Sequence, residues 1–447
     1  MRLILLLFLL CFNLSFSQEN TNKYLPADLA SLEIYLKKIN ENHTNKISGE
    51  FSSKIKKVFK NRDEKIFESI KDSNYVFNPT IQKNLDAILE NIYKSNPEIN
   101  TTDFRFFIKN SIIPNAACYG DGMFEIHLGL FTSLEYDDEL AFIICHEIAH
   151  KLLEHSMKNI SKRVATINSK ETKDKVKGIK KSMYGQGRAA LALIDELSIN
   201  MIDYSKEVEA EADSLGFVLF SKTSYSNQQA ISSLSKLELK DDMVLYHDIK
   251  VDSIFNFDTF PFKSYWLKES TSLFDTSKKI NEFALVSDTL KTHPEIEFRI
   301  NKLIKEFNIK ETSPKGTKLY LNEINKQAHF ESVSYTIDLK FLDLAIYQLV
   351  QKFENNLIGP EYYYSTMAEV LKRIYLAKKN HELGKYVPPK NNFSDEKQLN
   401  TIRLFLHNLE LNEVTKLGLV FCETNMNKFQ SNVSFETTYN FFKTINN

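Results

Sequence analysis

The amino-acid sequence predicts a predominantly helical α+β fold with one small β-sheet. Three observations support this fold class. Residues 27–95 place apolar side chains at helical spacing, as in LASLEIYLKKI and TIQKNLDAILENIYK. Between residues 104 and 128 the period changes to the apolar–polar alternation that is typical of strands. Beyond residue 310 helical spacing returns, which predicts a separate helical region at the C-terminus.

The chain has 447 residues, which is long for one compact core and predicts two or three domains. We expect an N-terminal helical segment over 18–75, a central domain over 76–310 and a C-terminal helical domain over 311–447. The hydrophobic content of 43% and the charged content of 26% are typical of a soluble globular protein. A formal net charge of -1 argues against a general nucleic-acid binder.

Residues 1–17 have the pattern of a signal peptide. Met1 and Arg2 precede the apolar run LILLLFLLCFNLSF, and small residues stand at Ser15 and Ser17, so we expect cleavage after Ser17. The alternatives are an uncleaved membrane anchor and a lipoprotein signal at Cys11, which the bulky Leu10 disfavours. No later stretch reaches the roughly 20 apolar residues that span a bilayer. The expected location is therefore outside the cytoplasm, either periplasmic or secreted.

Three cysteines remain after cleavage: Cys118, Cys145 and Cys422. At most one disulfide can form, so the fold must depend on its apolar core. Cys145 directly precedes a histidine of the motif described below. Its side chain points about 100° away from that histidine on a helix, which favours a buried apolar role over metal ligation.

The central region begins with two predicted strands. Phe104, Phe106 and Ile108 alternate in one, and Phe124, Ile126 and Leu128 alternate in the other, after the turn Gly120-Asp121-Gly122. Residues 137–139 are acidic, as the N-terminus of a helix favours. We expect the helix that follows to bury a stripe formed by Leu140, Ile143, Ile144, Ile148 and Leu152.

The next segment, residues 169–181, is rich in lysine and predicts a solvated insertion, with a basic substrate-steering patch as the alternative. Helical spacing returns in RAALALIDELSINMI, EVEAEADSLGFVLFSK and AISSLSKL. Residues 252–267, with Pro261, predict an irregular loop or lid. The C-terminal helices are similar to tetratricopeptide helix pairs, but an ordinary helical appendage fits equally well.

The chemistry is concentrated in the pentapeptide His146-Glu147-Ile148-Ala149-His150. Residues four apart lie on one face of a helix, so the two imidazoles can bind one metal ion. Glu147 lies beside that face and can take a proton from a zinc-bound water molecule. This arrangement is typical of zinc proteases.

A catalytic zinc needs a third protein ligand. His155 follows His146 by nine residues, and an uninterrupted helix would place it on the opposite face, so we expect it not to be a ligand. A better candidate lies in residues 207–216, where Glu209 and Asp213 stand four apart. One carboxylate could bind zinc while the other orients a ligand histidine. The alternative is a solvated acidic helix face.

Four ordered segments over residues 76–305 carry a family resemblance: NAACYGDGMFEIHLGL, DDELAFIICHEIAHKLLEH, EAEADSLG and THPEIEFRINKL. Together they resemble the gluzincin zinc metalloproteases that include HtpX and the CAAX prenyl endopeptidases, in particular the soluble exported bacterial members. The resemblance implies a zincin-like core and one Zn²⁺ per chain, bound by His146, His150 and Glu209. It further implies Glu147 as general base and Asp213 as the carboxylate that orients a ligand.

The last of these segments contains His293 and Arg299. By resemblance, His293 is a candidate for regulating access to the zinc cleft or contacting the metal, and Arg299 for stabilising developing negative charge. A helix entry followed by a surface arginine is the alternative. The resemblance also makes residues 122–128 the candidate substrate edge, the strand edge that would pair with an extended substrate backbone. His127 within them either joins the site or faces outward.

The predicted function is an exported zinc endopeptidase that hydrolyses peptide bonds through a metal-activated water, acting in envelope protein quality control. The alternative is a non-proteolytic or latent chaperone or assembly factor that binds proteins through its C-terminal helices. The expected substrate is an unfolded or extended polypeptide, with no nucleic-acid partner. Peripheral membrane association is left open. Many relatives lack the lysine-rich insertion and contain transmembrane helices. We therefore do not infer the substrate of this chain from the membrane-protein substrates of those relatives.

Overall fold

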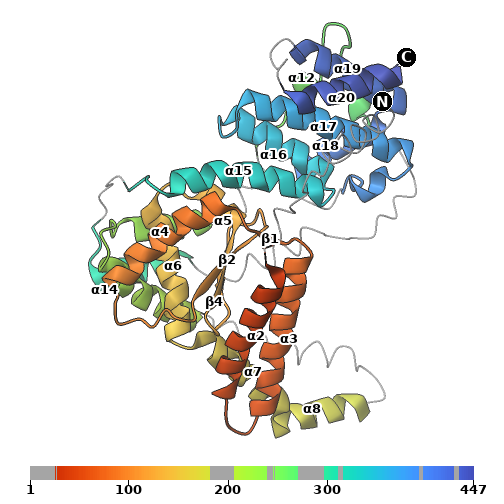
Figure 1. Cartoon of the computed structure of the whole chain (residues 1–447). Coiled ribbons are helices and arrows are strands. Elements are labelled where there is room, and N and C mark those ends of the chain that lie inside the picture. Colours follow the sequence, from red (N-terminus) through yellow and green to blue (C-terminus); the bar gives the residue numbers. More distant parts are fainter. Residues whose placement is uncertain are drawn as a thin grey trace, which may run out of the picture.

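The computed structural model describes most of the chain. The described residues are 26, 28–181, 206–238, 245, 247–269, 296–310, 316–391, 396–426 and 432–446. The predicted signal peptide and His293 lie outside them. The fold class is confirmed, because the molecule is mostly helical with one small mixed sheet (Figure 1). No helix of the described part is long and apolar enough to cross a membrane.

The sheet has four strands in the order β1-β2-β4-β3. The strands are β1 (Tyr75–Val76), β2 (Arg105–Lys109), β3 (Ala116–Cys118) and β4 (Met123–His127). Strands β2 and β4 are parallel, whereas β1 pairs with β2 and β3 pairs with β4 in antiparallel fashion. The two predicted strands are confirmed as β2 and β4, although Leu128 begins helix α5 (Leu128–Ser133).

The predicted substrate edge at residues 122–128 is wrong. Strand β4 has a hydrogen-bonded neighbour on both sides, β2 and β3, so its backbone groups are already paired. The outer strand on this side of the sheet is β3, which packs against helix α6 (Asp137–Leu152). The sequence did not indicate β3, because three residues are too few to show a period.

The two faces of the sheet are covered differently. On one face, Ile108, Phe124 and Ile126 enter a core shared with α4 (Pro79–Ser95), α6 and a helix over residues 206–221, called here the Glu209 helix. On the other face, Phe107 and Met123 pack against the hairpin of α2 (Leu29–Asn45) and α3 (Ser52–Lys71). The alternation along each strand produces this division.

The start of α6 is buried. Asp137 accepts backbone N–H groups of Leu319, Tyr320 and Leu321, at the N-terminus of α15 (Leu321–Asp338). Asp138 accepts those of Ser226 and Thr317, and Glu139 pairs with Lys236 of α10 (Gln229–Glu238). The three acidic residues therefore hold segments that are distant in sequence against the motif helix, in addition to favouring its N-terminus.

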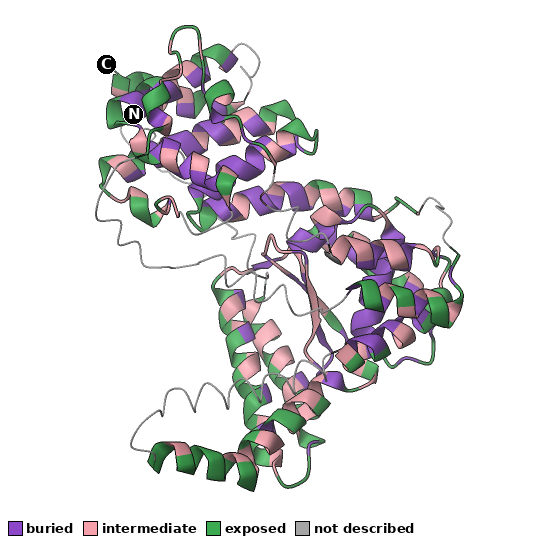
Figure 2. Ribbon diagram, turned by 180° about the vertical axis from the view of Figure 1, so that it is seen from behind, coloured by how far each residue is buried: buried purple, intermediate pink, exposed green. Residues whose placement is uncertain are grey.

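A sharp turn ends α6. Glu154 adopts the left-handed conformation with φ 57°, and α7 (His155–Asn168) starts in a new direction. It is followed by α8 (Lys170–Lys181), none of whose residues is buried (Figure 2). This exposure agrees with the predicted solvated insertion.

The C-terminal helices form a second core. Its helices are α16 (Leu342–Glu354), α17 (Pro360–Lys379), α18 (Lys397–Asn408), α19 (Leu411–Met426) and α20 (Val433–Asn446). Helix α15 joins the two cores, since its first half packs in the sheet core and its second half here (Figure 1). The division at residue 310 stays a prediction.

The aromatic segment 252–267 belongs to this second core. It contains most of α12 (Val251–Ile254) and the short η1 (Ser264–Leu267). Trp266 is fully buried, donates to Glu413 at 3.0 Å and packs against Phe405 of α18. The predicted irregular backbone is found, but the segment is a structural part of the C-terminal core and not a lid.

One buried cation in this core leads to a stability prediction. Lys352 of α16 is 5% exposed, and its Nζ lies 3.1 Å from Nδ1 of His329. Burial lowers the pKa of Lys352 to about 7. The unfolded chain therefore binds more protons than the folded one between this pKa and about 10.4, and stability rises with pH across that window. Lys352→Met should therefore raise the free energy of unfolding above that of the wild type more at pH 7 than at pH 10. The difference between the two increases should be about 1–3 kcal/mol.

Thermal unfolding at the two pH values measures this difference. Lys379→Met, at an exposed position of α17, is the control and should show no pH-dependent change. An equal effect of Lys352→Met at pH 7 and pH 10 would contradict the assigned charge penalty.

Candidate metal centre

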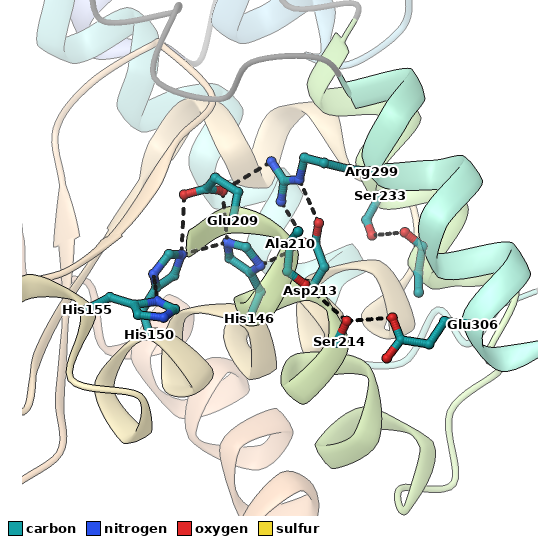
Figure 3. A network of polar contacts seen from close by, with 11 residues as sticks. His146, His150, His155, Glu209, Ala210, Asp213, Ser214, Ser233, Arg299 and Glu306 are labelled. Atoms are coloured by element: carbon teal, nitrogen blue, oxygen red, sulfur yellow. Dashed lines mark hydrogen bonds and ion pairs between the residues drawn. The ribbon is translucent and has the colours of Figure 1, made fainter. Parts of the chain in front are cut away.

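Three predicted ligands converge in the structure. His146 and His150 of α6 point their Nε2 atoms toward each other at 3.0 Å. The carboxylate of Glu209 lies above them, with Oε2 3.5 Å from Nε2 of His146 and Oε1 3.5 Å from Nε2 of His150 (Figure 3). The ligand atoms of these three side chains all lie within 4.8 Å of one another, so within the described part of the chain they form a group that could hold a metal ion.

The two distances from the Glu209 carboxylate to the histidine nitrogens fit zinc. Tetrahedral coordination with zinc–ligand distances of about 2.0–2.2 Å places the donor atoms roughly 3.3–3.5 Å apart. Two imidazole nitrogens and a carboxylate oxygen are a ligand set found in catalytic zinc sites, which leave a position open for water. The side chains present therefore suit a catalytic zinc ion.

A second layer of charge surrounds His146. Its Nδ1 lies 3.0 Å from Oδ1 of Asp213, an ion-pair distance that places this carboxylate behind the ring while Nε2 faces the ligand group. Asp213 receives two hydrogen bonds of 2.7 Å from Arg299, whose Nη1 also lies 3.2 Å from Oε2 of Glu209 (Figure 3). Arg299 is 2% exposed, so the alternative of a surface arginine is wrong.

The pKa values reflect this network. Burial raises the pKa of Asp213, but the Arg299 guanidinium outweighs it and brings the pKa to about 2. Burial lowers the pKa of His146, while hydrogen bonds to Asp213 and Glu209 raise it to about 10. The carboxylates of the site thus attract positive charge, as a cation site requires.

Small residues bring the two helices together. Ala210 and Ala212 of the Glu209 helix are buried. Gly216 matters equally, because a Cβ atom there would lie 2.9 Å from Cα of His146. Any larger residue would push the Glu209 helix away from α6 and separate Glu209 from the histidines.

Glu147 is buried and lies near the outer strand of the sheet. Burial and the Glu147 carboxylate both raise the pKa of the Cys118 thiol in β3. Glu147 also adds to the acidic groups, led by Asp213, that raise the pKa of Arg299. The expected base is therefore close to both the charged cluster and β3. Cys145 is fully buried in the apolar core, as predicted, and the three described cysteines are free thiols.

His155 lies next to the site, which the sequence did not indicate. It is outside the group of three ligands, but the expectation that it faces away from them is wrong, because the turn at Glu154 interrupts the helix. Its Nδ1 lies 2.9 Å from Nδ1 of His150. His127, in contrast, contacts Glu125 on the hairpin side of the sheet, away from the ligands.

The sequence model of peptidase family M48 matches residues 79–306, slightly more than half of the chain. The chain belongs to peptidase family M48. This confirms the resemblance stated from the motifs. Metalloprotease YcaL of Escherichia coli (strain K12) is 27% identical over 139 residues, which are 31% of this chain and 53% of that protein. The chain thus spans about half the length of this relative, and the C-terminal helices lie beyond the family match.

Proposed function

We propose that this M48 metallopeptidase is a zinc-dependent endopeptidase whose zinc is held by His146, His150 and Glu209. The observation that carries the proposal is the convergence of these three side chains, with the Glu209 carboxylate 3.5 Å from Nε2 of each histidine. When bound, zinc supplies a Lewis acid that activates a water molecule and polarises the scissile carbonyl. The family membership supports peptide-bond hydrolysis as the reaction.

The residues around the site then have distinct roles. Glu147 accepts a proton from the attacking water and later donates it to the leaving amine. Asp213 holds the ring of His146 with Nε2 toward the ligand group. Arg299 holds Asp213 and Glu209 together, so we propose a positioning role for it in place of direct stabilisation of substrate charge. His293 remains a candidate regulator of access.

The substrate is proposed to be an unfolded or extended polypeptide. Strand β3 is the outer strand beside α6, and an extended backbone can add to such an edge. The packing of α6, the helix that carries Glu147, against β3 supports this placement, since a peptide added along β3 would lie beside the motif helix. The signal-peptide pattern of residues 1–17 supports export, and with it a role in envelope protein quality control.

Metal removal tests the proposal. The purified mature protein should contain close to one zinc per chain and hydrolyse casein. Removing zinc with 1,10-phenanthroline should abolish hydrolysis, and added Zn²⁺ should restore it, because the ligand histidines and Glu209 alone cannot activate water. Protein that neither contains nor takes up zinc would overturn the site assignment. Zinc-loaded protein that binds casein without cleaving it would favour the alternative, a binding factor using the C-terminal helices.

A further inference from the structure

We propose that His155 and Glu211 form a positioning chain that orients His150 for metal binding. This inference rests on the proposed zinc function and assigns it two further residues. Nδ1 of His155 lies 2.9 Å from Nδ1 of His150, and Nε2 of His155 lies 3.2 Å from Oε2 of Glu211. The three side chains therefore lie in sequence from the ligand group toward the surface. Figure 3 shows the first two of them, His150 and His155, side by side.

One arrangement of protons satisfies every nitrogen in this chain. Nε2 of His150 faces His146 and Glu209, so it must be unprotonated to bind a metal. Its proton is then on Nδ1 and is donated to Nδ1 of His155. The proton of His155 is consequently on Nε2 and is donated to the Glu211 carboxylate. Each hydrogen bond favours the tautomer of His150 that binds metal.

The backbone holds His155 in place. The left-handed turn at Glu154 directs the first residue of α7 back toward the end of α6. The next residue, Ser156, donates to the carbonyl of Cys118 in β3 at 2.9 Å. Gly120 permits this contact, because a Cβ atom there would lie 2.6 Å from Cβ of Ser156. His155 itself is 3% exposed, so its ring has little freedom to turn away.

The Glu209 helix thereby supplies carboxylates that orient both ligand histidines. Glu209 completes the ligand group, Asp213 orients His146 directly, and Glu211 orients His150 through His155. The two supports differ in strength. Asp213 is buried and paired with Arg299, whereas the side chain of Glu211 is 60% exposed and its contact is weakened by water. We therefore expect His155 to matter more than Glu211.

Zinc affinity of the purified protein, measured by competition with a chromophoric chelator, tests the chain. His155→Phe keeps a ring but removes the hydrogen bonds, and should weaken zinc binding by about 10–100-fold. His155→Asn offers a carbonyl oxygen near the position of Nδ1 and should recover most of that loss. Glu211→Ala should weaken binding by about 2–10-fold. Glu207→Ala, at an exposed position of the same helix, should leave it unchanged.

The Co²⁺-substituted protein gives a second readout. His155→Phe should shift the visible absorption of bound Co²⁺, because the ring of His150 loses its fixed orientation, while Glu207→Ala should not. Zinc affinity within twofold of the wild type in His155→Phe, with an unchanged Co²⁺ spectrum, would overturn the proposal. Equal losses in His155→Phe and His155→Asn would also overturn it, since packing alone would then explain them.

Two features keep the test decisive. If His155→Phe does not fold, His155→Asn and the exposed Glu211→Ala decide the outcome: unchanged zinc affinity in Glu211→Ala together with a full loss in His155→Asn rejects the chain. Failure of the wild type to bind zinc refutes the zinc function itself. Normal binding in the wild type and in all His155 variants refutes only the positioning role.

Discussion

Replacement of Glu147 by Gln is expected to abolish peptide hydrolysis while zinc stays bound. The amide has nearly the shape of the carboxylate but cannot accept the proton of the attacking water. Loss of general-base catalysis should lower kcat by about 10²–10⁴-fold. Since Glu147 is not in the ligand group, the zinc content should remain close to one per chain. Casein hydrolysis and metal analysis on the same preparation measure both effects.

The matched control for this variant is Glu171→Gln, which removes an exposed carboxylate on α8 and should leave hydrolysis unchanged. Hydrolysis by Glu147→Gln within twofold of the wild type would exclude Glu147 as the base. Complete inactivity of the zinc-loaded wild type as well would point to the non-proteolytic alternative.

Replacement of Glu209 by Gln is expected to have the largest effect on zinc. The change removes the negative charge that faces both histidines at 3.5 Å and leaves a weaker neutral ligand. Loss of a residue that only orients a ligand already costs about 10–100-fold in metal affinity, so loss of a charged ligand should cost more than about 100-fold. Zinc content after dialysis and the chelator-competition Kd measure the loss.

Glu207→Gln is the control for the choice of ligand. Glu207 lies two residues away on the same helix and is exposed. The zinc affinity of Glu207→Gln should therefore match that of the wild type. A loss in Glu207→Gln with normal binding in Glu209→Gln would reassign the third ligand. Equal small effects in both variants would mean that neither carboxylate binds the metal.

The local parts of the site could be predicted from the sequence because a helix fixes its own geometry. His146 and His150 share one face at a spacing of four whatever the helix packs against, and Glu147 follows beside them. The alternation in β2 and β4 was visible for the same reason. Strands β1 and β3, of two and three residues, are too short to carry a period and were missed.

The parts that depend on pairing were not predictable. Whether β4 lies inside the sheet or at its edge depends on which strands hydrogen-bond to it, and this moved the proposed substrate edge to β3. The role of His155 depends on a single left-handed residue, Glu154, which the helical pattern does not reveal. The aromatic segment 252–267 likewise showed its apolar character but not the helices that bury it.

By itself, the sequence determined the fold class, the family resemblance and the histidine pair with its neighbouring glutamate, because helix and strand periods are set by local backbone geometry. Only the tertiary structure decided that His155 contacts the ring of His150, that Arg299 is buried against Asp213 and Glu209, and which strand borders the site. Those features depend on the relative placement of α6, the Glu209 helix and β3. That placement is set by close contacts such as that of Gly216 with His146, between residues far apart in the chain.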